Sequence, residues 1–269
     1  MTKVPGVTVS PHDTNWSGLS AIANVSAGRC GLEVGHTAVA CARSSPPPGR
    51  ASVPSDEVPW ASMYLPKHFR AGDVETEELL AGIRTADLIT PSADGLYATF
   101  LPLIYAADAG RPGSLLGHVA RKNDHWRLAP LSESLVIAHG PDAYITPAWY
   151  ASKREHGRVV PTWNYTTAHV YGELVVHDDV VWLERVVRLL TDRHEAARSE
   201  PWSVDDAPRE YTEGQLQAIV GLELRISRVE AKVKLGQNRS AADIDGVIEG
   251  LRDVGDQASA VATSRARRN

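Results

Sequence analysis

The stretch that decides the fold is residues 158–177, RVVPTWNYTTAHVYGELVVH, the longest strand candidate in the chain. In its second half His169, Tyr171 and Glu173 alternate with Val170, Gly172 and Leu174. A repeat of two places successive side chains on opposite faces of a strand. A long alternating strand of this kind favours a β-rich fold.

The rest of the chain contains more strand patterns than helix patterns, and short turns such as Ala93-Asp94-Gly95 separate them. Predicted strands cover residues 88–90 (ending at Pro91), 96–106, 114–120, 134–139, 143–146 and 219–235. Predicted helices begin near Asp73 and cover residues 179–194, 211–218 and 241–251. This order predicts a mainly β fold with peripheral helices, an antiparallel barrel and not an alternating βαβ sheet.

Composition restricts the classes of function. The chain has 269 residues, 43% of them hydrophobic, which is enough for one or two domains with a buried core. The net charge of −5 gives no general attraction to nucleic acid or to an anionic membrane. With only Cys30 and Cys41, a disulfide framework and a thiolate metal site are not expected, and we predict no metal. No apolar run approaches the roughly 20 residues that cross a bilayer, and no secretory leader is recognisable, so we expect a cytoplasmic location.

The sequence divides into three regions. Residues 1–62 are rich in Ala, Ser, Gly and Pro and lack a strong period, which predicts a disordered extension and makes Met63 an alternative start position. A small appended module around residues 32–42 is the rival interpretation. Residues 63–253 form the expected domain, and residues 254–269 are interpreted as a disordered basic tail.

Several familiar catalytic and nucleotide-binding motifs are missing. The chain has neither the G-x-G-x-x-G nor the G-x-x-x-x-G-K-[ST] fingerprint of nucleotide sites, and no G-x-S-x-G elbow. His194-Glu195 does not begin a zinc helix, because the position of the second histidine is Arg198. No helix-turn-helix with a basic recognition helix is recognisable.

Two basic clusters follow predicted strands, at 117–123 (GHVARKN) and 147–153 (PAWYASK). Arginine, lysine, serine and backbone N–H groups are the donors that a phosphate dianion needs. Aromatic residues nearby could form the wall and edge of a slot for a flat cofactor. These are Trp149, Tyr150, Trp163, Asn164 and Tyr165. From composition alone, a solvated turn and core tryptophans are the favoured explanation of the same residues.

Five stretches together resemble the PaiB family of FMN-binding transcriptional regulators. They are MYLPKHF (63–69), GHVARKN (117–123), HGPDAYITP with the following WY (139–150), VVPTWNY (159–165) and KLGQNR (234–239). The resemblance covers residues 63–253 in order. It implies a split β-barrel of the pyridoxamine-oxidase type, with FMN held at the interface of a homodimer.

The resemblance also implies the cofactor-binding residues. A strand including Thr99, Phe100, Leu101 and Pro102 would lie beside the isoalloxazine, and His118, Arg121 and Lys122 would face the phosphate. Ser152 and Lys153, with Gln237 and Asn238 from the partner subunit, are further candidates. Gly236 stands where relatives often have serine, which removes one hydroxyl donor.

Two functions are compatible with such a protein. The first is a negative transcriptional regulator, with DNA as a partner by resemblance only. The second is a flavin-dependent oxidoreductase acting on a small molecule, with His118 and His169 as candidates for proton transfer. No catalytic residue is assigned from the sequence, since a fold of this kind carries both enzymes and binding proteins.

Overall fold

The computed structural model describes residues 62–108 and 111–267. The predicted disordered extension, the rival module at 32–42 and both cysteines lie outside these ranges, except for residue 62. Everything below concerns the described residues.

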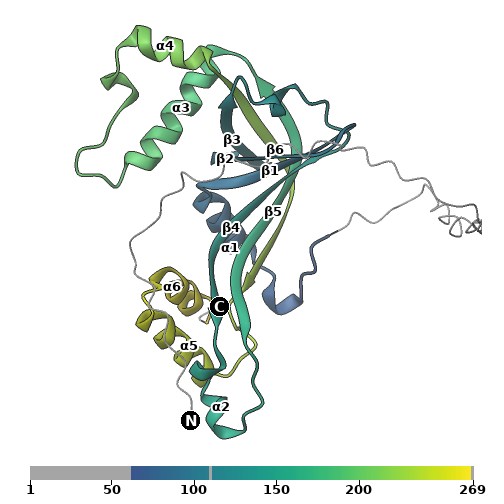
Figure 1. Ribbon diagram of the computed structural model, residues 1–269, viewed down its shortest axis with the longest axis vertical. Coiled ribbons are helices and arrows are strands. Elements are labelled where there is room, and N and C mark those ends of the chain that lie inside the picture. Colours follow the sequence, from purple (N-terminus) through teal and green to yellow (C-terminus); the bar gives the residue numbers. More distant parts are fainter. Residues whose placement is uncertain (1–61, 109–110, 268–269) are drawn as a thin grey trace, which may run out of the picture. The chain divides into compact units, whose positions relative to one another are not determined.

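Six antiparallel strands close into a barrel (Figure 1). Their order around the barrel is β1-β2-β3-β6-β5-β4. The strands are β1 (Thr85–Ser92), β2 (Gly95–Asp108), β3 (Arg111–Ala120), β4 (Ser134–Ile145), β5 (Thr162–His177) and β6 (Ile219–Lys234). This arrangement confirms the predicted mainly β fold with peripheral helices.

The two longest strands, β5 and β6, pair from Tyr165 opposite Lys234 to His177 opposite Gly221. On its other side β5 pairs with β4. The predicted strands 134–139 and 143–146 are therefore one strand, because the ladder resumes after a bulge between His139 and Asp142. Pro91 does not end β1 either, since it lies opposite Leu96 in the ladder with β2.

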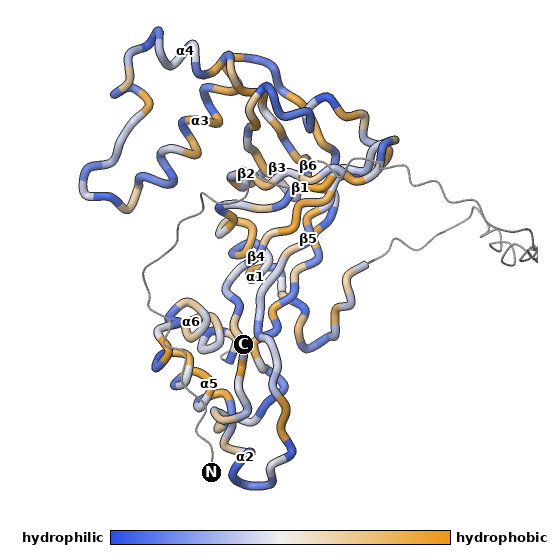
Figure 2. The backbone as a smooth tube through the Cα atoms, in the orientation of Figure 1, coloured by the Kyte–Doolittle hydropathy of each residue, from blue (hydrophilic) through white to orange (hydrophobic). Residues whose placement is uncertain are grey.

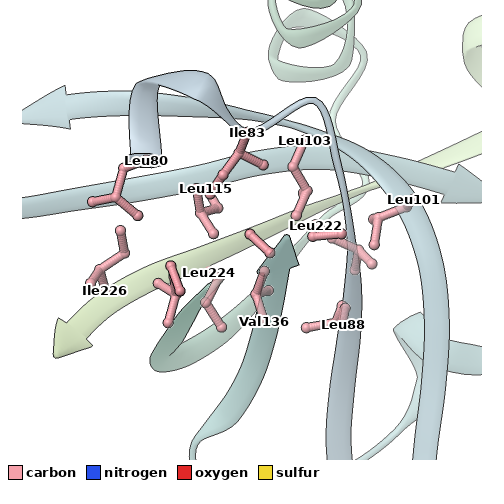
Figure 3. Packing of buried hydrophobic residues seen from close by; sticks show 14 of the residues in the cluster. Leu80, Ile83, Leu88, Leu101, Leu103, Leu115, Val136, Leu222, Leu224 and Ile226 are labelled. Carbon is pink, nitrogen blue, oxygen red and sulfur yellow. The ribbon is translucent and has the colours of Figure 1, made fainter. Parts of the chain in front are cut away.

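The inner face of every strand contributes to one hydrophobic core (Figure 3). Leu88, Leu101 and Leu103 from β1 and β2 meet Leu222 and Leu224 from β6. All five side chains are at most 3% exposed. Fully burying a leucine side chain contributes about 1.5–3 kcal/mol, so this cluster provides a large part of the barrel's stability.

Helices lie at both ends of the strands (Figure 1). The α-helices are α1 (Asp73–Gly82), α2 (Ala151–Glu155), α3 (Val180–Glu195), α4 (Arg209–Gln217), α5 (Ala241–Asp253) and α6 (Gln257–Ala266). Short 3-10 turns are η1 (Lys67–Phe69), η2 (Asp124–Arg127), η3 (Pro147–Trp149) and η4 (Val204–Asp206). In the described part of the chain no helix combines the length and hydrophobicity needed to cross a membrane.

Helix α6 corrects the expectation of a disordered tail over residues 254–269. The helix is capped by Asp256, whose side chain accepts a hydrogen bond from the Ser259 backbone N–H at 3.0 Å. Ala260 and Thr263 are at most 1% exposed. The basic residues Arg265 and Arg267 suggested a solvated end, but the small residues Ala260, Thr263 and Ala266 are buried.

Helix α3 covers the outer face of β3. Asp179 caps it by accepting the Trp182 N–H at 2.8 Å. The tube in Figure 2 alternates between hydrophobic and hydrophilic colours along this helix. Its buried residues Val186 and Leu190 pack against Leu116 of β3. Helix α3 therefore covers the outer face of the barrel at β3.

Gly172 allows β5 and β6 to approach closely at a break in their register. A Cβ atom added at this position would overlap the backbone carbonyl of Arg225. Backbone cannot move aside as a flexible side chain can, so a side chain here must distort the ladder.

We predict that Gly172→Ala lowers the free energy of unfolding by about 1–3 kcal/mol, the usual cost of overpacking. Urea denaturation measures the change. Gly214→Ala in α4 is the matched control, because a Cβ there meets no atom within 4 Å. We expect the control to be neutral or stabilising, since alanine favours a helix over glycine by up to about 1 kcal/mol. Equal stability of Gly172→Ala and the wild type would contradict the prediction.

Candidate functional site

Strand β2 carries the residues predicted to lie beside the flavin, and its two faces have different roles. Leu101 is 2% exposed and belongs to the barrel core, so its side chain does not reach the outer surface. Phe100 points outward and is 68% exposed, and Leu96 on the same face is 79% exposed. Pro102 continues this outward row. The predicted stretch is therefore divided between the core and the surface.

The outward residues of β2 continue into an apolar surface across the neighbouring strands. Ile89 of β1 lies opposite Ala98 on one side and opposite Leu135 of β4 on the other. We call this surface the outer apolar face. It comprises Leu96, Ala98, Phe100 and Pro102 of β2, Ile89 of β1, and Leu135 and Ile137 of β4. Asp87 stands within it, opposite Phe100 and Ile137.

Thr99 faces the barrel interior and takes part in a buried chain of hydroxyl and imidazole groups. Its Oγ1 lies 2.8 Å from Nδ1 of His125, and Nε2 of His125 lies 2.8 Å from Oγ1 of Thr90. Thr90 in turn contacts the Ser134 hydroxyl at 2.8 Å. His125 is fully buried, and this burial lowers its pKa. The side chain of Thr99 therefore links β2 to η2 and β1 inside the barrel and does not face the surface on which the flavin was predicted to lie.

Arg121 begins the turn after β3 and is held by protein groups. Its guanidinium donates two hydrogen bonds to the Asp178 carboxylate, at 2.8 and 2.5 Å. It also donates to the backbone carbonyls of Gln217 and Ile219. The Asp178 carboxylate raises the pKa of Arg121 through the hydrogen bonds, and Arg121 lowers the pKa of Asp178 in return. Sequence reasoning could not find this partner, which is 57 positions away.

Lys122 and His118 differ from Arg121 in their surroundings. Lys122 is exposed and has no side-chain partner among the described residues. His118 of β3 lies opposite Gly221 of β6. A Cβ atom added at Gly221 would overlap the ring of Trp182 from α3, so α3 packs against this side of the two strands. Burial there lowers the pKa of His118. His118 therefore lies on the α3 side of the barrel and not on the outer apolar face.

The remaining predicted residues lie at the far end of β6. Ser152 is buried, and its N–H and hydroxyl both donate to the Asp243 carboxylate. Gln237 closes its own turn by accepting from the Leu235 N–H and donating to the Val233 carbonyl. Lys153 and Asn238 are exposed. Of these four, Asn238 lines a pocket.

Arg121 and Asn238 lie near opposite ends of β6. Arg121 donates to Ile219 at the first residue of the strand, whereas Asn238 follows its last residue, Lys234. A strand of 16 residues spans roughly 50 Å at about 3.3 Å per residue. The structure does not bring the two groups of predicted residues together within one chain.

Three cations that sequence reasoning missed gather at this far end. Lys232 lies over the rings of Tyr64 and Tyr165, at 5.5 and 5.4 Å. Lys234 lies 5.6 Å from the Tyr165 ring, and Arg239 lies 4.7 Å from the Tyr150 ring. The spacing of the two lysines by two positions on a strand was the available clue, since it places both on one face.

The described residues contain no group of three or more histidine, cysteine, aspartate or glutamate side chains that could hold a metal ion.

A family model described as "Putative FMN-binding domain" matches residues 63–228. The chain belongs to this family. Protease synthase and sporulation protein PAI 2 of Bacillus subtilis is 32% identical over 195 residues, which are 71% of this chain and 90% of that protein. An uncharacterized protein of Aspergillus fumigatus is 31% identical over 216 residues, covering 65% of this chain and 83% of the relative. These matches establish the PaiB-type, FMN-binding family suggested by the five sequence stretches.

Solved structures resemble this FMN-binding family member more distantly. The flavocytochrome Anf3 of Azotobacter vinelandii has a TM-score of 0.44 at 13% identity, covering 62% of this chain and 69% of that one. An FAD- and heme-binding protein of Mycobacterium smegmatis has a TM-score of 0.43 at 17% identity, covering 61% and 72%.

The buried histidines make stability depend on pH. Burial lowers the pKa of His118, His125 and His169, so below about pH 6.5, the ordinary histidine pKa, the unfolded chain binds more protons than the folded one. We predict that the free energy of unfolding is fully present above about pH 6.5 and falls as the pH is lowered towards the folded pKa values.

Urea denaturation at about pH 7.5 and about pH 5.5 measures this dependence. His125→Gln should show a smaller change between the two values, because it removes one of the titrating groups. His194→Gln, which alters an exposed side chain of α3, is the matched control. An identical pH dependence in His125→Gln and the wild type would refute the assignment of His125.

Proposed function

We propose that this protein binds FMN at a homodimer interface built on the outer apolar face and acts as a negative regulator of the PaiB type. The observation that carries the proposal is the outward row of β2, where Leu96 and Phe100 are 79% and 68% exposed. Membership of the FMN-binding family supports the choice of cofactor.

The outer apolar face suits a flat aromatic ring. Ligand sites are mostly apolar, with a few polar groups that fix orientation. Phe100 and Pro102 supply apolar contact on β2, and Asp87 supplies a polar group within the same surface. Thr99 and Leu101 would act from beneath, by holding β2 in place.

The phosphate would lie at the turn after β3. Lys122 offers an unpaired ammonium group, and Arg121 offers a guanidinium fixed by two backbone carbonyls. The bond between Arg121 and Asp178 is partly exposed, and exposed ion pairs contribute only about 0–1 kcal/mol. A phosphate dianion can replace Asp178 at small cost, because charge-assisted bonds to phosphate are stronger than most.

Two features support a homodimer. Contiguous exposed apolar surface usually marks an interaction site. The predicted residues at opposite ends of β6 are also too far apart for one small cofactor to touch both within a chain. A second copy placed on the outer apolar face could supply Gln237 and Asn238 to the flavin of the first.

The bound FMN would supply hydride- or electron-transfer chemistry, while the residues of this chain bind and orient it. The regulatory role rests on the relationship to the Bacillus subtilis sporulation protein. Helices α3 and α4 are poor candidates for contacting DNA, because residues 180–217 hold eight acidic residues and five arginines. We therefore expect regulation through a protein partner or another surface.

We predict that replacing Arg121 and Lys122 together by alanine weakens FMN binding about tenfold or more, since each charge-assisted hydrogen bond contributes about 1.5–3 kcal/mol. Quenching of flavin fluorescence during titration gives the affinity. The matched control for lost charge is Arg198→Ala with Arg209→Ala, which changes two exposed residues, one just after α3 and one at the start of α4. Unchanged affinity in the Arg121 and Lys122 variant would place the phosphate elsewhere.

The same preparation distinguishes a regulator from an oxidoreductase. Under anaerobic conditions, bound FMN should stay oxidised when NADH or NADPH is added, and bleaching at 1:1 stoichiometry would favour the enzyme. The visible spectrum reports the outcome directly.

The proposed homodimer interface can be tested at Phe100. Phe100→Asp should shift the protein to a monomer and abolish FMN binding, because burying an unpaired carboxylate at the interface costs several kcal/mol. Light scattering after size exclusion gives the mass. Val181→Asp is the matched control on α3, where Val181 is 76% exposed. A Phe100→Asp protein that remains dimeric would exclude this face as the interface.

A further inference from the structure

A small pocket lies where the end of β6 meets the N-terminal end of α5. Its volume is about 160 Å³. Tyr150, Asn164, Lys234, Arg239 and Asp243 line it, together with apolar side chains such as Phe69. We call it the α5 pocket. It is separate from the outer apolar face and from the turn after β3.

Neither of the two cations at the α5 pocket forms a salt bridge within the described part of the chain, although the charge of Arg239 acts on Asp243. Lys234 Nζ donates to Thr162 Oγ1 at 2.8 Å and to the Trp163 carbonyl at 2.5 Å, which leaves one donor free. Arg239 lies over the Tyr150 ring. Burial lowers the pKa of Lys234, and the nearby charges of Lys232 and Arg239 lower it further. Two cationic side chains and one carboxylate, Asp243, line the pocket, so it keeps a net positive charge.

Asn164 provides an independent indication of a ligand. It is 3% exposed and faces the α5 pocket from β5. Its side chain has no hydrogen-bond partner in the described part of the chain. Among the described residues, the fully buried and unpaired polar side-chain atoms are the hydroxyls of Thr166 and Thr263, so the little exposed area of Asn164 lets its amide reach the pocket, where it can bond a ligand or water.

The backbone adds the dipole of helix α5, although the N–H groups of Asp243 and Ile244, which line the pocket, already donate to Ser240. Helix α5 begins here after its cap Ser240, and its first N–H groups carry the positive end of the helix dipole. Gly236 adopts a φ of +85°, which turns the chain sharply between β6 and α5. The turn brings Arg239 back beside Lys234.

The one acidic residue lining the pocket is already satisfied. Asp243 accepts hydrogen bonds from the N–H and the hydroxyl of Ser152. Its own N–H donates to the Ser240 hydroxyl at 3.2 Å. Hydrogen bonds from Ser152 and Ser240 and the charge of Arg239 outweigh the effect of burial and lower the pKa of Asp243. Asp243 fixes α2 against α5 and does not neutralise Lys234.

We propose that the α5 pocket is an anion site that binds the phosphate or carboxylate group of a small molecule through Lys234, Arg239 and Asn164. Sites that enclose a drug-sized ligand measure roughly 300–1,000 Å³, so a pocket of this size takes one charged group and not a whole flavin. Asn238, which the proposed function gives to the flavin of the other subunit, also lines the pocket, so the proposal holds both for the phosphate of that FMN and for a separate molecule.

Titration of the full-length protein with inorganic phosphate tests the proposal. Chloride is replaced by phosphate at constant ionic strength, and backbone amide NMR signals of residues 241–243 are followed. We expect saturable shifts. Asn164→Asp and Arg239→Gln should each weaken binding about tenfold or more, as expected for losing a bond to a charged group. Arg252→Gln, an exposed residue in the last turn of the same helix, is the matched control and should bind as the wild type does.

Asn164→Asp buries a carboxylate and could impair folding, so Arg239→Gln, which changes a partly exposed residue, provides the second test. Absence of saturable shifts in the wild type would overturn the proposal. Equal shifts in Arg239→Gln and Arg252→Gln would also overturn it.

Comparison of FMN with riboflavin identifies the source of the anion. If the phosphate of FMN from a partner subunit occupies the pocket, Arg239→Gln weakens FMN but not riboflavin, and phosphate competes with FMN alone. If a separate molecule occupies it, both flavins bind Arg239→Gln normally and phosphate still binds beside saturating FMN. Both results support an anion site in the α5 pocket. The affinity for FMN is measured separately, so failure of the proposed function would be distinguished from failure of the anion site.

Discussion

The pairing of β5 with β6 is the interaction on which the rest of the structure depends. The two strands stay hydrogen-bonded from Tyr165 and Lys234 to His177 and Gly221. Their inner residues, among them Val170 and Leu222, complete the barrel core. The same ladder continues past the barrel and carries the cations at its far end. One ladder therefore serves both as a wall of the core and as the support of the cations around the α5 pocket.

The ladder is long enough for its two ends to lie beside different groups of charged side chains. At the start of β6, backbone carbonyls hold the Arg121 guanidinium at the turn after β3. At its end, Lys234 and Arg239 surround the α5 pocket. The two ends of the strand lie roughly 50 Å apart, several times the Debye length of about 8 Å at physiological salt, so charge at one end has little effect at the other. Under the two proposals, a flavin phosphate near Arg121 and an anion in the α5 pocket would use different side chains.

Much of the fold was predictable from local pattern. The alternation in residues 169–176 correctly predicted a long strand, and Asp179 correctly marked the start of α3. Where local rules failed, packing was the reason. Pro91 stays within β1, and residues 140–141 form a bulge inside β4, because the neighbouring strands continue the ladder past them. Helix α6 was missed because its small residues gain stability only from burial against other elements.

The sequence by itself determined which residues share a face of each strand and which family motifs are present, since both depend on neighbours along the chain. Only the tertiary structure decided which face of β2 is inside, placing Leu101 in the core and Phe100 outside. It also decided the partners of Arg121 and Ser152, which are Asp178 and Asp243. These partners lie 57 and 91 positions away, and barrel closure and helix docking bring them together. A period of two shows that residues lie together, but only the closed barrel shows what they face.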